Sequence, residues 1–214
     1  MNPLTELPAR VRRFTRSETW VHWSMAALMG LCILTAACLY VPQFAELVGR
    51  RELVVRLHEW SGLLLPAPYL AGLASRAFRA DLRRLNRFVP HDRTWLRSAL
   101  RRSGPRPAGK FNAGQKLYAG WLAGAVLVML GTGLLMWSTL PQALGFARAG
   151  GTPIVPLTWR TGSTFVHDWL SLALGMVVAG HIAKAWADPE ARLGIRTGFV
   201  GREWAEREHG EWLP

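Results

Sequence analysis

The chain has 214 residues and a formal net charge of +12, and half of its residues are hydrophobic. A basic balance can indicate a nucleic-acid partner or an anionic membrane surface. Here the apolar residues form four blocks of about twenty, the length of helix that spans a bilayer. The positive charges flank these blocks and no nucleic-acid motif is present, so membrane lipid is the expected surrounding and nucleic acid is excluded.

The four apolar blocks predict an all-α fold, a four-helix transmembrane bundle that forms one domain over residues 1–214. A basic arm over residues 1–18 precedes the first span. Pro66 and Pro68 predict a kink within the second span. Trp and Tyr residues at the block ends are typical of membrane-interface belts. The spans are expected at about residues 19–41, 53–75, 117–138 and 161–186.

The polar segments between and after the spans have different expected structures. In residues 76–116, the part before Ser103 predicts a short amphipathic surface helix, and SGPRPAG predicts a loop. Residues 139–160 are expected to be a loop and residues 187–214 a polar tail. His91 and His209, in the loop and the tail, are interpreted as solvated surface histidines.

The distribution of Lys and Arg predicts the orientation of the chain in the membrane. With four spans, both termini and the 76–110 loop lie on the same side, which carries twenty Lys and Arg against five on the other. Positive residues are enriched in cytoplasmic loops. We therefore expect an inner (plasma) membrane protein of bacteria with a basic cytoplasmic loop and tail and with both termini in the cytoplasm.

Two histidines in the last apolar block are the first indication of a site. His167 and His181 are fourteen residues apart, nearly four helical turns, so both rings leave the same face about 21 Å apart. An ionisable group in a transmembrane segment indicates a functional site. The other spans are therefore expected to supply partners at the same two depths.

His22 and His58 are the histidines at matching depths. His22 lies near the cytoplasmic start of the first span, and His181 lies near the cytoplasmic end of the fourth. His58 and His167 both lie toward the outer side. The pairs His22/His181 and His58/His167 suit bis-imidazole ligation of two b haems, which favours electron transfer over oxygen chemistry. Two ligands per site are too few for a structural zinc ion. Cys32 and Cys38 form no CxxCH motif, so covalently attached haem is not expected.

Residues near the four histidines also fit flat macrocycles. Small residues follow each ligand by four positions on the same helical face, at Ala26, Gly62, Ser171 and Ala185. Haem propionates need cations, and the candidates are Arg16, Arg56 and Arg160.

Nearly the whole chain resembles the membrane-anchoring gamma (cytochrome b) subunit of respiratory formate dehydrogenases, a four-helix di-haem protein. The motifs that carry the resemblance are RFTRSETWVHW at 13–23, LHEWSG at 57–62, GKFNAGQKLY at 109–118 and HDWLSLALGMVVAGHIAKAW at 167–186. The resemblance implies axial haem ligands at His22, His58, His167 and His181.

The same resemblance implies a quinone site and partner subunits. A pocket for menaquinone or ubiquinone is expected where Asn112, Gly114 and Gln115 meet the His181 region; a plain helix start with Asn112 as its cap is the alternative. The partners are expected to be an iron–sulfur beta subunit and an alpha subunit that contains molybdenum or tungsten. The family usually has His-Pro at the second ligand, whereas here Glu59 follows His58 and is expected to pair with Arg56.

The expected function is electron transfer from the iron–sulfur subunit through two haems to quinone; the chain has no formate site of its own. One alternative is the cytochrome b anchor of a hydrogenase or another molybdenum oxidoreductase. A second is a haem-free membrane scaffold or metal transporter whose histidines handle ions. The spans contain few carboxylates, with Glu59 and Asp168 the main ones, which argues against transport.

Overall fold

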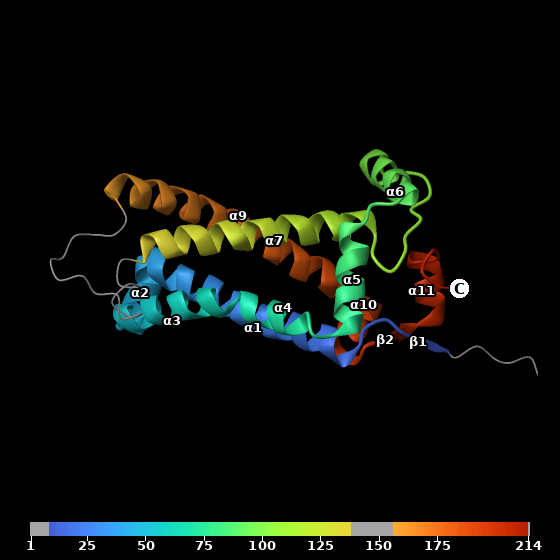
Figure 1. The fold of residues 1–214 in the computed structure, drawn as a ribbon, viewed down its shortest axis with the longest axis horizontal. Helices are drawn as coiled ribbons and strands as arrows, with labels where there is room; N and C mark the ends of the chain where they lie inside the picture. The colour runs from blue at the N-terminus through green and yellow to red at the C-terminus, as the bar shows by residue number, and fades with distance from the viewer. Residues whose placement is uncertain (1–8, 138–155, 214) are drawn as a thin grey trace, which may run out of the picture. The chain divides into compact units, whose positions relative to one another are not determined.

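The computed structural model describes residues 9–137 and 156–213, and these residues are nearly all helical (Figure 1). The all-α class expected from the apolar blocks is confirmed. Residues 139–155 of the expected loop lie outside the described residues. Residues 157–160 belong to the helix Leu157–Ala187, so the expected loop is wrong there. The helices are α1 Arg16–Tyr40, α2 Pro42–Val48, α3 Arg51–Leu64, α4 Pro66–Gly72, α5 Arg76–Asn86, α6 Pro90–Arg101, α7 Ala113–Met136, α9 Leu157–Ala187, α10 Pro189–Thr197 and α11 Arg202–Glu208.

Three of these helices are long and apolar enough to cross a membrane, namely α1, α7 and α9. They correspond to the expected spans at 19–41, 117–138 and 161–186. In the most apolar window of α7 only 6% of the residues are buried inside the protein. Apolar helices that expose their side chains in this way are suited to lipid, where all backbone hydrogen bonds are satisfied within the helix.

The expected second span, 53–75, is divided into the shorter helices α3 and α4, with Leu65 between them. Proline has no backbone N–H and its ring clashes with the preceding turn, so Pro66 begins a new helix. The kink is therefore at the expected proline, but neither half alone has the length of a membrane-spanning helix.

The chain forms two compact units, and their boundaries fall within α1, α4, α7 and α9. Unit 2 comprises residues 24–68 and 122–180, of which 24–68, 122–137 and 156–180 are described. Its small core consists of Met29, Leu65, Ala125 and Leu174.

Unit 1 comprises residues 1–23, 69–121 and 181–214, of which 9–23, 69–121 and 181–213 are described. Two short strands, β1 Arg10–Arg12 and β2 Phe199–Gly201, pair antiparallel in it, with Val11 opposite Val200. Gly198 precedes β2 with φ +85°, and a Cβ there would lie 2.5 Å from the Phe14 carbonyl oxygen, so this turn requires glycine. The tail is therefore folded against the basic arm, whereas the sequence suggested only a polar extension.

The 76–116 segment is more ordered than one surface helix. It contains α5 and α6, separated by Arg87, Phe88 and Val89, and a loop that leads into α7. Ser75 caps α5 by accepting a hydrogen bond from the backbone N–H of Phe78. Seven of the twelve Lys and Arg residues of this segment thus lie on these two amphipathic helices.

Candidate haem sites

Unit 2 brings His58 of α3 and His167 of α9 together. Their ring centroids are 6.2 Å apart with an interplanar angle of 73°. Both rings line a cavity of about 440 Å³, within the range usual for small-molecule and cofactor sites. Arg51, Glu59 and Asp168 also line it, so charged groups are present beside an otherwise apolar wall.

Unit 1 brings His22 of α1 and His181 of α9 together. Their ring centroids are 6.4 Å apart with an interplanar angle of 58°. Trp23 packs edge-on against His22 at 5.4 Å, and Tyr118 of α7 stacks on His181 at 5.0 Å. Tyr118 is the last residue of the GKFNAGQKLY motif, and nothing in its spacing connects it with His181.

The ring separations fit the binding of one metal ion between each pair. A metal–nitrogen bond to imidazole is about 2.0 Å and that nitrogen lies about 1.1 Å from its ring centroid, so opposed imidazoles on one metal have centroids about 6.2 Å apart. The two observed separations, 6.2 and 6.4 Å, agree with this value. Within the described residues, no group of three or more His, Cys, Asp and Glu side chains is placed to hold a metal ion.

Threonines hold the Nδ1 atoms of both histidines in unit 2. The hydroxyl of Thr35 on α1 lies 2.9 Å from His58 Nδ1, and that of Thr132 on α7 lies 2.9 Å from His167 Nδ1. Each ring is therefore held through Nδ1, which leaves Nε2 as the nitrogen available to a metal. Sequence reasoning did not identify either threonine.

Small residues give the cavity in unit 2 room for a flat ligand. Gly62 and Ser171, both expected beside a ligand, line it. Gly133 also lines it, and a Cβ there would lie 3.5 Å from His167 Cε1. Of the corresponding residues near the other pair, Ala26 is exposed and Ala185 is half-buried.

The three arginines expected to bind haem propionates lie in different surroundings. Arg16 is exposed. Arg56 makes its ion pair with Glu52, at 2.5 Å on the surface of α3, rather than with the expected Glu59. Arg160 has a buried Nε with no hydrogen-bond partner among the described residues. Arg51, which the sequence did not single out, lines the cavity of the His58/His167 pair.

The three residues expected at a quinone site lie at the start of α7, with Asn112 just before the helix and Gly114 and Gln115 in its first turn. The backbone N–H of Gln115 donates to Asn112 Oδ1, and the backbone N–H of Asn112 donates to Gln115 Oε1, both at 2.9 Å. This reciprocal arrangement is a capping box, as the alternative reading of Asn112 anticipated. A Cβ on Gly114 would lie 2.8 Å from the ring of Trp95, so close packing of α6 explains this glycine.

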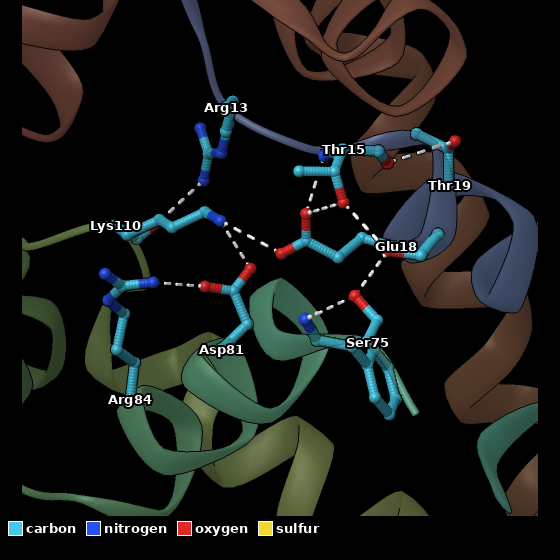
Figure 2. A network of polar contacts seen from close by, with 10 residues as sticks. Arg13, Thr15, Glu18, Thr19, Ser75, Asp81, Arg84 and Lys110 are labelled. Carbon is cyan, nitrogen blue, oxygen red and sulfur yellow. Dashed lines mark hydrogen bonds and ion pairs between the residues drawn. The ribbon is translucent and has the colours of Figure 1, made fainter. Parts of the chain in front are cut away.

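A buried ion network surrounds Lys110, just before that cap (Figure 2). Lys110 Nζ lies 3.3 Å from Glu18 Oε1 and also contacts Asp81 Oδ2. Arg84 contacts the other oxygen of Asp81 at 2.7 Å, and Arg13 donates to the Lys110 carbonyl at 2.9 Å. The network thus joins the basic arm, the start of α1, α5 and the segment before α7.

Burial controls the protonation of the charged groups in this part of unit 1. Desolvation and the neighbouring Glu18 raise the pKa of Asp81 to about 6, although Lys110 acts in the opposite direction. Desolvation lowers the pKa of Arg13 to about 10. A second buried pair, Lys116 with Asp92 at 2.6 Å, fixes the start of α7 to α6.

His209 is not the solvated histidine that its place in the tail suggested. Only 3% of it is exposed, and its Nδ1 lies 2.7 Å from the Gly109 carbonyl oxygen. It packs against the ring of Trp204 with centroids 5.0 Å apart. Desolvation and the positive charge of Arg13 lower its pKa to about 4. His91 is half-buried.

Comparison with known proteins places this geometry in a family context. The family model of prokaryotic cytochrome b561 matches residues 13–190. The cytochrome b556 subunit of formate dehydrogenase from Haemophilus influenzae is 24% identical over 199 residues, which cover 89% of this chain and 77% of that protein. The cytochrome b556 subunit of the nitrate-inducible formate dehydrogenase from Escherichia coli is 24% identical over 205 residues, which cover 89% of this chain and 84% of that protein.

Proposed function

This chain belongs to the prokaryotic cytochrome b561 family, and we propose that it is the membrane electron-transfer subunit of a respiratory formate dehydrogenase. Membership of a cytochrome b family implies haem b and electron transport. The formate dehydrogenase assignment is supported by the names of relatives that are similar over most of the chain.

Two b haems are proposed, one held by His22 and His181 and one by His58 and His167. The observation that carries this proposal is the separation of the paired rings, 6.4 and 6.2 Å, which suits one iron between two imidazoles. Haem b with two imidazole ligands exchanges single electrons and leaves no open position for oxygen.

The residues around the His58/His167 pair have distinct tasks in this proposal. Thr35 and Thr132 orient the two imidazoles through Nδ1. Gly62, Gly133 and Ser171 leave space for a flat ring, and the apolar residues of the cavity wall pack against it. Arg51 provides a positive charge for a propionate.

A quinone, menaquinone or ubiquinone, is proposed to accept the electrons beside Asn112, Gly114 and Gln115, near His181. The oxygens of Asn112 and Gln115 cap α7, so their NH₂ groups are the donors that can bind a quinone carbonyl. Reduction to quinol takes two electrons and two protons, and the protons come from the cytoplasmic side.

The membrane arrangement is also a proposal. The chain forms one integral membrane domain over residues 1–214, and α3 and α4 together provide the second of four spans. Both termini and the α5–α6 segment lie in the cytoplasm, on the inner membrane of a bacterium, because Lys and Arg are concentrated there.

An iron–sulfur subunit and a molybdenum- or tungsten-containing subunit are the proposed partners. The alternative is the cytochrome b anchor of a hydrogenase or another molybdenum oxidoreductase. Complexes purified from native membranes distinguish these functions. Formate is expected to reduce the haems; reduction by hydrogen and not by formate would favour the hydrogenase alternative.

The quinone site is tested with variants that keep the cap of α7. Asn112→Asp and Gln115→Glu retain the capping oxygens but remove the NH₂ donors. We expect the rate of haem reduction by quinol to fall at least about 10-fold with haem content unchanged, in keeping with the cost of an unpaired polar group in a binding site. Asn86→Asp, an equal charge change on the exposed end of α5, is the control. If both cap variants reduced the haems with quinol at the wild-type rate, quinone binding at this position would be ruled out.

A further inference from the structure

The two histidine pairs differ in what holds their ring nitrogens. His58 and His167 each have Nδ1 at 2.9 Å from a threonine hydroxyl, on α1 and α7 respectively. No ring nitrogen of His22 or His181 has a hydrogen-bond partner within residues 9–137 and 156–213. The aromatic rings that pack against these two imidazoles are each other's and those of Trp23 and Tyr118.

The direction of the threonine hydrogen bonds follows from the other atoms around each hydroxyl. Thr35 Oγ1 lies 2.7 Å from the Leu31 carbonyl oxygen, and Thr132 Oγ1 lies 2.8 Å from that of Val128. A carbonyl can only accept, and a hydroxyl has one proton to donate. Each threonine therefore donates to its own helix and accepts from the Nδ1–H of the histidine.

This arrangement selects one tautomer for His58 and His167. With the proton on Nδ1, the lone pair of Nε2 is free to bind iron. A ligand imidazole that donates its other N–H to an acceptor is more basic, and such partners tune the metal it binds. Stronger donation stabilises ferric over ferrous iron and so lowers the reduction potential.

We propose that Thr35 and Thr132 are positioning residues that make the haem of the His58/His167 pair the lower in reduction potential of the two. This inference rests on the proposed function. With both haems bound, transfer of one electron to the haem of the His22/His181 pair would then be downhill. The iron between His58 and His167 would be oxidised to the ferric state, and the other iron would be reduced to the ferrous state. No proton moves, because Nδ1–H and the hydroxyl proton remain in place.

A potentiometric titration of the haems in the purified full chain tests the inference. Thr35→Val and Thr132→Val remove the hydroxyl that accepts from Nδ1–H, so the lower potential is expected to rise while the higher one stays unchanged. Thr35→Ser and Thr132→Ser keep a hydroxyl and are expected to restore the wild-type potential. Thr161→Val is the matched control, because Thr161 donates to the Leu157 carbonyl in the same way but contacts no histidine.

The possible results separate this inference from the proposed function. The inference would be overturned if a valine variant that holds both haems kept the wild-type lower potential. It would also be overturned if the higher potential shifted instead. If the valine variants lose haem, as a loss of about 10–100-fold in affinity would cause, His181→Ala provides the second test. It is expected to leave only the lower-potential haem, and retention of the higher-potential one would refute the inference. A wild-type chain without haem would refute the proposed function itself.

Discussion

His209 shows at the scale of one residue how a buried histidine becomes sensitive to acid. Its pKa is lowered from 6.5 to about 4, so the folded chain binds fewer protons than the unfolded chain between these values. The stability that the neutral ring provides is complete above pH 6.5 and is lost as the pH falls toward 4. The contribution of His209 to the free energy of unfolding is expected to fall by about 3 kcal/mol over this pH range.

Replacement of His209 by asparagine is expected to remove this acid sensitivity. Asn can donate to the Gly109 carbonyl as the histidine does, but it does not titrate. Hydrogen exchange of the peptides from α10 to α11 in unit 1, measured between pH 6.5 and 4, reports the local free energy of opening. We expect the wild-type protection to fall relative to that of His209→Asn by about 3 kcal/mol.

The variant comparison is needed because Asp81 acts in the opposite direction. Its pKa is raised to about 6, so protonation of Asp81 stabilises unit 1 as the pH falls. Asp81 is present in both proteins and cancels in the difference. Parallel curves for the two proteins would contradict the burial of a neutral His209.

Lys110 is the cation that Glu18 and Asp81 share. Lys110→Met is expected to destabilise unit 1 by about 3–5 kcal/mol, because it leaves two buried carboxylates without their common partner. Hydrogen exchange of α5 at pH 7 measures the loss. Arg207→Met, which breaks an exposed pair with Glu208, is the control and is expected to cost at most about 1 kcal/mol. Equal effects of the two changes would argue against the network.

The histidines could be predicted from sequence, whereas their threonine partners could not. The four rings stand out because an ionisable group is costly in an apolar helix and because their spacing assigns depths. A threonine in a membrane helix usually bonds to its own carbonyls, as Thr35 and Thr132 also do. Nothing in the spacing connects them with histidines 23 and 35 residues away.

At the scale of elements, Gly72 at the end of α4 allows close packing in unit 1. A Cβ there would lie 2.7 Å from Val21 Cγ2 and 3.0 Å from the ring of Phe78. Gly72→Ala is therefore expected to destabilise this unit by about 1–3 kcal/mol. Gly162→Ala on α9 has open space and is expected to be neutral or to stabilise by up to about 1 kcal/mol. Chemical denaturation in detergent compares the two, and a Gly72→Ala chain as stable as wild type would contradict the packing.

Helices were easier to predict than the other elements for a physical reason. The apolar blocks indicate α1, α7 and α9 directly, because the bilayer thickness requires about twenty residues. The strands β1 and β2 are three residues each and pair across almost the whole chain, so no local pattern marks them. The proline in the second span indicated a kink, but the complete division into α3 and α4 required the structure.

At the scale of the molecule, each histidine pair lies within one compact unit. His22 and His181 both belong to unit 1, and His58 and His167 both belong to unit 2, although α9 supplies one member to each. The paired rings therefore come together without any assumption about how the two units are placed. The central claim is that each pair holds one haem b.

The reduced-minus-oxidised absorption spectrum of the purified chain, with the pyridine haemochrome assay for haem content, tests this claim most directly. The account predicts two b haems per wild-type chain, and one per chain in both His58→Ala and His22→Ala. A helical, folded chain without haem would contradict the account, and so would a wild-type chain that binds a single haem.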